Sequence, residues 1–191
     1  WLLFFGDNDI FFNKNVMKQF SERLKSLNNN TLIVYGKVDI VGKGKTLATH
    51  GEAWNLIKKD FYSIMNIPHQ GVFHRKSLFN IHGFFNEKYK FAGEYDMCIK
   101  AISSSLPVFI QDLTVCKMTY GGVSSQASNS WKVLKEFKEI RKNNGLKVYT
   151  LKWSWNFIKS IFKLFISKFI GNDKTYEIIF KIKKIYNFFS K

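Results

Sequence analysis

Apolar positions in the first part of the chain alternate between short continuous runs and helical spacing. Residues 2–5 (LLFF) and 31–38 (TLIVYGKV) are continuous apolar runs, which are typical of strands buried on both faces of a parallel sheet. Between them, apolar side chains recur at helical spacing over residues 13–27. This alternation of strand, helix and strand is typical of an α/β protein.

The middle of the chain contains shorter elements separated by glycine, proline and polar residues. Glycines at 42, 44 and 51 favour a loop over residues 39–51. The remaining pattern predicts, in order, a helix or two short turns over 52–65, a strand over 72–74, a helix over 76–81 that Gly83 ends, a helix over 96–103, strands over 107–110 and 113–118, and a charged helix over 128–143.

The end of the chain is basic, aromatic and amphipathic. Residues 152–170 (KWSWNFIKSIFKLFISKFI) place apolar side chains along one side of a predicted helix and lysines along the other, and residues 176–189 repeat the mixture. This pattern is typical of a helix that lies in a membrane interface. The alternative is that both helices pack on the rest of the protein or on a second subunit. Because each stretch is interrupted by lysines, neither predicts a membrane-spanning helix.

Composition indicates the number of domains and the kinds of binding partner. The chain has 191 residues, 46% of them hydrophobic, which suits one domain with an appendage. Thirty Lys and Arg against fourteen Asp and Glu give a formal net charge of +16. Such an excess is compatible with nucleic acid, an anionic membrane surface or a phosphorylated substrate, or with solvated lysines of no specific role. Nucleic acid is the unlikely partner, because only three of the basic residues are Arg.

Two further features of the sequence are its two cysteines and the residue at which it starts. Cys98 and Cys116 lie in separate apolar contexts without CxxC spacing, so we expect core thiols rather than a disulfide or a zinc site. The chain starts at Trp1 in an apolar run, and we expect that an N-terminal part of the natural protein precedes it.

Acidic residues follow the first predicted strand. Gly6 is succeeded by Asp7, Asn8 and Asp9, and ligands in α/β sheets collect beyond the carboxyl ends of strands. Two carboxylates at positions i and i+2 can hold a hard cation such as Mg²⁺ or Mn²⁺, which in turn can hold a diphosphate. The alternative is a simple turn stabilised by Asx hydrogen bonds.

A second acidic pair lies at the start of a predicted helix. The positive end of the helix dipole favours negative charge on Glu94 and Asp96, so either carboxylate is suited to act as a general base. A His-Gln pair, His69 and Gln70, follows Ile67-Pro68. Residues 120–125 (YGGVSS) form a polar loop whose backbone N–H groups suit an anion, or a plain turn.

The order of these motifs resembles that of the family 2 glycosyltransferases of bacterial surface-polysaccharide assembly. The motifs are GDND after a strand, PHQGVFHRKSLF, GFFNEKYK, EYDM and GGVSS, and together they cover roughly residues 1–125. The resemblance implies the GT-A fold, which is Rossmann-like α/β, with this chain corresponding to its C-terminal portion. The nucleotide-binding half of the family's domain would precede Trp1, so the isolated fragment is expected to be inactive.

The resemblance also implies roles for particular residues. Asp7 and Asp9 would hold the Mg²⁺ or Mn²⁺ ion that bridges the donor diphosphate. Glu94 would be the catalytic base, with Asp96 as the alternative. The residues expected beside the donor and acceptor sugars are His69, Gln70, Asn8, Gly122 and Ser124.

Two departures from the family pattern affect these assignments. The usual adjacent acids correspond here to Asn8 and Asp9, which makes Asp9 the firmer metal ligand. The base is more often Asp, so the longer Glu94 leaves exchange with Asp96 open. The Gln-x-x-Arg-Trp motif of processive synthases does not occur in the sequence, which favours single addition.

The sequence thus predicts three segments and one leading function. Residues 1–127 are the partial catalytic domain, 128–150 a connecting helix, and 151–191 basic helices on the inner face of the cell membrane, with the protein cytoplasmic. The function is inverting, metal-dependent sugar transfer from a nucleotide-sugar donor to a saccharide or lipid-linked acceptor. The alternatives are a non-enzymatic basic module that binds membrane or nucleic acid, and an inactive glycosyltransferase fragment.

Overall fold

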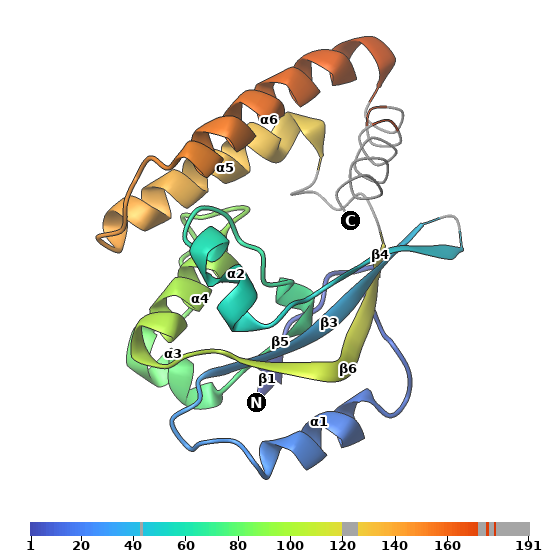
Figure 1. Ribbon diagram of the computed structural model, residues 1–191, viewed down its shortest axis with the longest axis vertical. Coiled ribbons are helices and arrows are strands. Elements are labelled where there is room, and N and C mark those ends of the chain that lie inside the picture. The colour runs from blue at the N-terminus through green and yellow to red at the C-terminus, as the bar shows by residue number, and fades with distance from the viewer. Residues whose placement is uncertain (43, 120–125, 172–174, 176–177, 179–191) are drawn as a thin grey trace.

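A curled, mixed six-stranded sheet forms the centre of the protein (Figure 1). The computed structural model describes residues 1–42, 44–119, 126–171, 175 and 178. Across the sheet the strands are ordered β1 (Leu2–Leu3), β5 (Val72–His74), β3 (Ile33–Gly42), β6 (Val108–Thr119) and β2 (Ile10–Phe11), while β4 (Lys45–His50) pairs with β3. The long strands β3 and β6 run parallel, and the other pairings are antiparallel.

The central strand β3 separates two hydrophobic cores. Because successive side chains of a strand point to opposite faces, Val34 and Val38 enter one core while Ile33 and Tyr35 enter the other. The first core is covered by helix α1 (Val16–Leu24), whose Phe20 ring stacks on Phe73 with 3.6 Å between ring centroids. In Figure 1 this helix lies alone on its side of the sheet.

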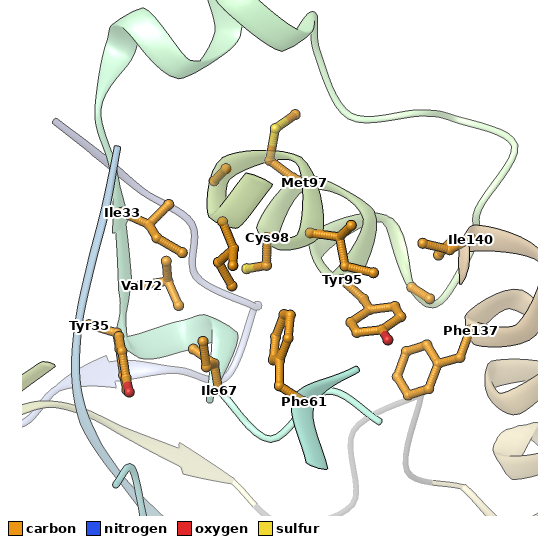
Figure 2. Packing of buried hydrophobic residues seen from close by; sticks show 14 of the residues in the cluster. Ile33, Tyr35, Phe61, Ile67, Val72, Tyr95, Met97, Cys98, Phe137 and Ile140 are labelled. Atoms are coloured by element: carbon orange, nitrogen blue, oxygen red, sulfur yellow. The ribbon is translucent and has the colours of Figure 1, made fainter. Parts of the chain in front are cut away.

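The second core is larger and is covered by α2 (Trp54–Phe61), α3 (Lys76–His82) and α4 (Gly93–Ser104). Figure 2 shows Phe61 and Tyr95 between the sheet residues and Phe137, which comes from α5 (Ala127–Asn143). Helix α4 has buried side chains over most of its circumference. It is therefore the helix around which this half of the molecule packs.

Helices α5 and α6 (Leu151–Ile170) form the layer farthest from α1, with α6 outermost (Figure 1). The indole N–H of Trp153 donates to the Leu134 carbonyl at 2.9 Å and joins the two helices. Arg141 is fully buried and its guanidinium donates to the carbonyl oxygens of Ser63 and Val148, at 3.3 and 2.6 Å. These bonds attach α5 to the segment after α2 and to the segment before α6.

Several predicted elements are confirmed. The predicted α/β class is confirmed: the protein is a mixed α/β protein with a curled, mixed six-stranded sheet and C-terminal helices. The helix predicted over 13–27 is α1, and the short strand over 72–74 is β5. The helices predicted over 52–65, 76–81, 96–103, 128–143 and 152–170 are α2 to α6, with ends shifted by a few residues. The segment predicted over 176–189 lies almost entirely outside the described residues.

Predictions for three parts of the sheet, two of strands and one of a loop, are wrong. Residues 2–5 do not form a buried parallel strand: β1 is a two-residue strand antiparallel to β5 at the end of the sheet, and Leu2 is exposed. The loop over 39–51 is a β-hairpin, in which Gly44, with a φ of 72°, occupies the turn between β3 and β4. The two strands predicted over 107–110 and 113–118 are one strand, β6 (Val108–Thr119), whose pairing with β3 shifts register instead of breaking.

The described helices include none that is both long enough and apolar enough to cross a bilayer.

Candidate functional site

The acidic motif after β1 forms a tight turn closed by Asp9. The Asp9 N–H donates to the Gly6 carbonyl at 3.0 Å, and its Oδ2 accepts from the Gly6 N–H at 2.8 Å. Asp7 and Asn8 are exposed at the tip, and the Asn8 carbonyl accepts from the Thr119 hydroxyl at 3.4 Å. The Asp9 side chain accepts from an N–H three residues earlier, so this bond is not the Asx bond, to an N–H two residues on, that a simple turn predicts. Asp7 remains exposed.

The Asp9 carboxylate lies near the end of β6, where Cys116 is buried. Burial, followed by the negative charges of Asp9 and Asp39, raises the pKa of the Cys116 thiol to about 12. The same thiol donates to the Gln70 carbonyl at 3.6 Å. Cys116 is therefore bonded to the His-Gln turn and lies near Asp9, which is sixty residues from that turn in sequence.

The His-Gln pair is fixed to the sheet by a contact between two glycines. His69 and Gln70 lie in the short 3₁₀ helix η1 (His69–Gly71). A Cβ atom on Gly71 would lie 2.9 Å from the Gly36 carbonyl oxygen of β3, so only glycine permits this approach. Gln70 is buried and its amide donates to the Met118 sulfur at 2.6 Å, while His69 remains half-buried.

The second acidic motif occupies the first turn of α4. Glu94 is half-buried and opens into a cavity of about 270 Å³. Its negative charge, together with burial as the larger cause, raises the pKa of the Cys98 thiol to about 12. The cavity is lined by one residue from the N-terminal segment and seven from the region before and at the start of α4: Phe4, Phe85, Asn86, Glu87, Tyr89, Lys90, Gly93 and Glu94.

Asp96 is held differently from Glu94. Only 3% of its surface is exposed, and its Oδ2 pairs with the Lys100 ammonium one helical turn later at 2.6 Å. Its Oδ1 accepts from the Asn144 amide at 3.3 Å. Both carboxylate oxygens therefore join α4 to itself and to the end of α5, and Glu94 is the acid that faces the cavity.

Sequence reasoning missed Glu136, a residue of α5 that holds the loop before α4. Its carboxylate accepts three backbone N–H groups, from Lys90 at 3.1 Å and from Phe91 and Ala92 at 2.9 Å each. These three residues immediately precede Gly93 and Glu94. No sequence signal could have identified this role, because the partners lie 44 to 46 residues apart and the bonds are to backbone atoms.

The segment from Phe4 to Asp9 connects the two acidic motifs. Phe4 lines the Glu94 cavity and packs edge-on against Phe85, with 5.0 Å between ring centroids. Asp9 lies at the other end of this segment, near Cys116, whose thiol donates to the Gln70 carbonyl. Five residues of extended chain span at most about 18 Å, and the Gly6–Asp9 turn shortens that distance. The backbone separation between Asp9 and the Phe4 side of the Glu94 cavity is therefore below this length.

The donor set of the Gly6–Asp9 turn fits a divalent cation only in part. No group of three or more His, Cys, Asp or Glu side chains that could hold a metal occurs among the described residues. Asp7 and Asp9 provide carboxylate oxygens, and one oxygen of Asp9 is engaged by the Gly6 N–H. Mg²⁺ is commonly bound by one or two carboxylates together with substrate phosphates and water, and this turn suits that arrangement.

Two predicted site residues and one larger hollow lie apart from the motifs described above. Gly122 and Ser124 lie outside the described residues. A hollow of about 420 Å³ between α1 and β6 is larger than the Glu94 cavity, but it contains none of the predicted site residues and its floor includes the ion pair of Arg23 with Asp112. The smaller cavity is therefore the better candidate for chemistry.

Comparison of the chain with models of known protein families and with curated protein sequences gives no match. The function is therefore inferred from the residues and their geometry.

Proposed function

We propose that the protein is an inverting glycosyltransferase of the family 2 type, built on the C-terminal portion of a GT-A fold. It moves a sugar from a nucleotide-sugar donor to a hydroxyl of a saccharide or lipid-linked acceptor in cell-surface polysaccharide synthesis. The observation that carries the proposal is the segment from Phe4 to Asp9: Phe4 lines the Glu94 cavity, and Asp9 lies near Cys116, whose thiol donates to the Gln70 carbonyl of the His-Gln turn.

Glu94 is the proposed catalytic base. It lies in the first turn of a 12-residue helix, where the dipole favours the carboxylate, and it opens into the cavity. Its carboxylate takes the proton of the acceptor hydroxyl while that oxygen bonds to the anomeric carbon. The bond from the anomeric carbon to the diphosphate breaks on the opposite face, the electron pair leaves with the diphosphate oxygen, and the configuration inverts.

Asp96 is assigned a positioning role instead. Its two oxygens are engaged by Lys100 and Asn144, and its side chain is buried. This favours Glu94 over Asp96 where the sequence left the choice open.

Asp9 and Asp7 are the proposed ligands of a divalent cation on the donor side. A bound Mg²⁺ or Mn²⁺ would supply positive charge that stabilises the departing diphosphate. His69, Gln70, Asn8, Gly122 and Ser124 are proposed to contact the donor and acceptor sugars.

The test is sugar transfer by the full-length protein, measured by mass spectrometry with a panel of nucleotide sugars, Mg²⁺ or Mn²⁺, and saccharide and lipid-linked acceptors. Wild-type protein is expected to transfer one sugar with inversion. Glu94→Gln removes the base and should lower the rate by about 10² to 10⁴-fold. Asp9→Ala should abolish the dependence on divalent cation together with most of the activity.

The matched control is Glu87→Gln, which changes a carboxylate in the same cavity that has no assigned chemical role. It should retain activity within a few-fold of wild type. Retained activity in both Glu94→Gln and Asp9→Ala would refute the site assignment. The competing class, a non-enzymatic basic module, instead predicts tight and salt-sensitive binding to polynucleotide or lipid with no transfer by the full-length protein.

A further inference from the structure

The outward side of α6 carries a continuous row of exposed apolar residues, here called the α6 stripe. Its members are three or four residues apart, so at 3.6 residues per turn they form a single line along the helix. Each is between 57% and 93% exposed. The α6 stripe consists of Leu151, Trp155, Ile158, Phe162, Phe165 and Phe169.

This row is too large for an incidental surface feature. An aromatic side chain offers about 150 to 250 Å², so six large side chains exposed to this degree present roughly 700 Å². The largest apolar patch on a typical monomer is about 300 to 600 Å². The α6 stripe therefore indicates a surface that binds another apolar surface.

The inward side of α6 is fixed, so the helix cannot rotate to bury the α6 stripe. Trp153 is buried, donates to the Leu134 carbonyl and stacks on Phe157 with 5.1 Å between ring centroids. Ser160 is also buried, and the Lys163 ammonium donates to the Ser130 hydroxyl of α5 at 3.2 Å. Thr150 caps the helix by accepting from the Trp153 N–H at 3.0 Å.

Charge identifies the partner surface. Helix α6 contains four lysines and no acidic residue. Lys159 and Lys168 are exposed on opposite flanks of the α6 stripe, and the Lys159 ammonium lies 5.1 Å from the Trp155 ring centroid. A long aliphatic stem beside an apolar row lets the ammonium reach outward to phosphate while the stem stays in apolar contact.

We infer that the α6 stripe docks on an anionic membrane surface, with α6 lying parallel to the bilayer in the interface. Pairing with a second copy is disfavoured: helix pairs of this spacing rely on complementary charges beside the apolar seam, and two α6 helices would bring only lysines together. The net charge of +16 repels a second copy and attracts anionic lipid. The inference does not depend on the proposed transferase activity.

The experiment is co-sedimentation of the full chain with unilamellar vesicles of phosphatidylcholine alone or with 30% phosphatidylglycerol. Wild type should bind the anionic vesicles at least tenfold more tightly than the neutral ones, and less tightly in 500 mM NaCl. Phe162→Ser with Phe165→Ser should lower binding to anionic vesicles at least tenfold. The matched control, Leu56→Ser with Phe84→Ser, removes two apolar side chains that are 72% and 82% exposed elsewhere and should bind as wild type.

Charge is tested separately with Lys159→Gln and Lys168→Gln, which should weaken binding to anionic vesicles and leave neutral vesicles unaffected. The control pair Lys14→Gln and Lys18→Gln changes exposed lysines at α1 and should have a smaller effect. Equal binding to both vesicle types, or unchanged binding of the Phe162 and Phe165 variant, overturns the inference. A lipid-free dimer in sedimentation equilibrium that this variant abolishes would assign the stripe to a second copy and would also overturn it.

Discussion

The two acidic parts of the candidate site are held in opposite ways. The loop that carries Glu94 is fixed from outside, by three backbone hydrogen bonds to Glu136 of another helix. The turn that carries Asp7 and Asp9 is closed mainly from within, by the bonds between Gly6 and Asp9, and its bond to another element is the long one from the Thr119 hydroxyl to the Asn8 carbonyl, at 3.4 Å. A base must be oriented before the substrate arrives, whereas a ligand of a diphosphate-bound cation can complete its coordination on binding. The difference in support matches the difference in proposed role.

Removing the external support should have the largest effect. Glu136→Ala leaves three N–H groups before α4 without their acceptor, and hydrogen bonds to charged groups contribute about 1.5 to 3 kcal/mol each. Because the site is half-buried, water can replace part of these hydrogen bonds. We therefore expect the free energy of unfolding, measured in urea, to fall by about 3 to 4 kcal/mol. Transfer activity should fall as well, because Glu94 is displaced.

The control is Glu139→Ala on the same helix, which loses an exposed ion pair with Lys88. Exposed pairs contribute about 0 to 1 kcal/mol, so this variant should remain close to wild type in both measurements. Equal losses in the two variants would show that Glu136 has no special role.

The aromatic wall between the two acidic parts should give the protein a pH dependence. His74 packs against Phe4, Phe79 and Phe85, with ring centroids 5.4 to 6.1 Å apart, and burial lowers its pKa to about 4. A pKa lowered by folding means that the neutral form is stabilised. Above pH 6.5 the titration of His74 therefore does not lower the free energy of unfolding. As the pH falls from 6.5 toward 4, the free energy of unfolding decreases by about 3 kcal/mol in all.

Urea unfolding between pH 7 and pH 4 measures this contribution, and His74→Phe is the matched variant. The phenyl ring suits the apolar surroundings and cannot titrate, so the difference in unfolding free energy between variant and wild type should grow in favour of the variant as the pH falls. A difference that stays constant with pH would contradict the prediction.

The His-Gln turn offers a test of intermediate size. Gly71→Ala places a methyl group 2.9 Å from both the Gly36 carbonyl oxygen and a Val38 methyl carbon. Overpacking of this kind costs about 1 to 3 kcal/mol, and thermal unfolding should register it. Gly93→Ala is the control, since its new Cβ atom would meet no atom within 4 Å. Equal destabilisation of both variants would count against the glycine contact as the cause.

The smallest change in stability is expected at the acidic turn itself. Asp9→Asn keeps an oxygen that can accept from the Gly6 N–H, and Asp7 is exposed, so both Asn variants should unfold within about 0.5 kcal/mol of wild type. Their Mg²⁺ requirement should nevertheless rise, more for Asp9→Asn than for Asp7→Asn, in a titration of transfer activity. A large loss of stability in Asp9→Asn would assign this carboxylate a structural role.

The helices and the placement of the acids could be predicted from the sequence because the signals are local. Apolar spacing over residues 128–143 depends only on helix geometry, and α5 agrees with it within a residue. The position of Glu94 in the first turn of α4 follows from the same kind of pattern.

What could not be predicted depends on pairings between distant residues. The β-hairpin of β3 and β4 has the sequence pattern of a loop, because its glycines suggest irregular structure. What makes it a hairpin is the register of the two strands and the bond from the Thr49 hydroxyl to Asp39, which join residues distant in sequence. The two-residue strand β1 exists only because β5 lies beside it. The contact of Glu136 with a backbone loop leaves no trace in residue spacing.

Helix α5 separates the Glu94 loop from α6, and this sets a distance. Its Glu136 holds the residues before Glu94, while its Leu134 accepts from Trp153 of α6. Packed helices lie about 8 to 10 Å apart, and both α5 and α6 lie between the cavity and a membrane that contacts the α6 stripe. The distance from that membrane to the cavity would therefore be fixed by the packing of these two helices. The cavity would then lie at a fixed height above the bilayer. The protein would act on acceptor hydroxyls held at that height and not on those held nearer to the bilayer or farther from it.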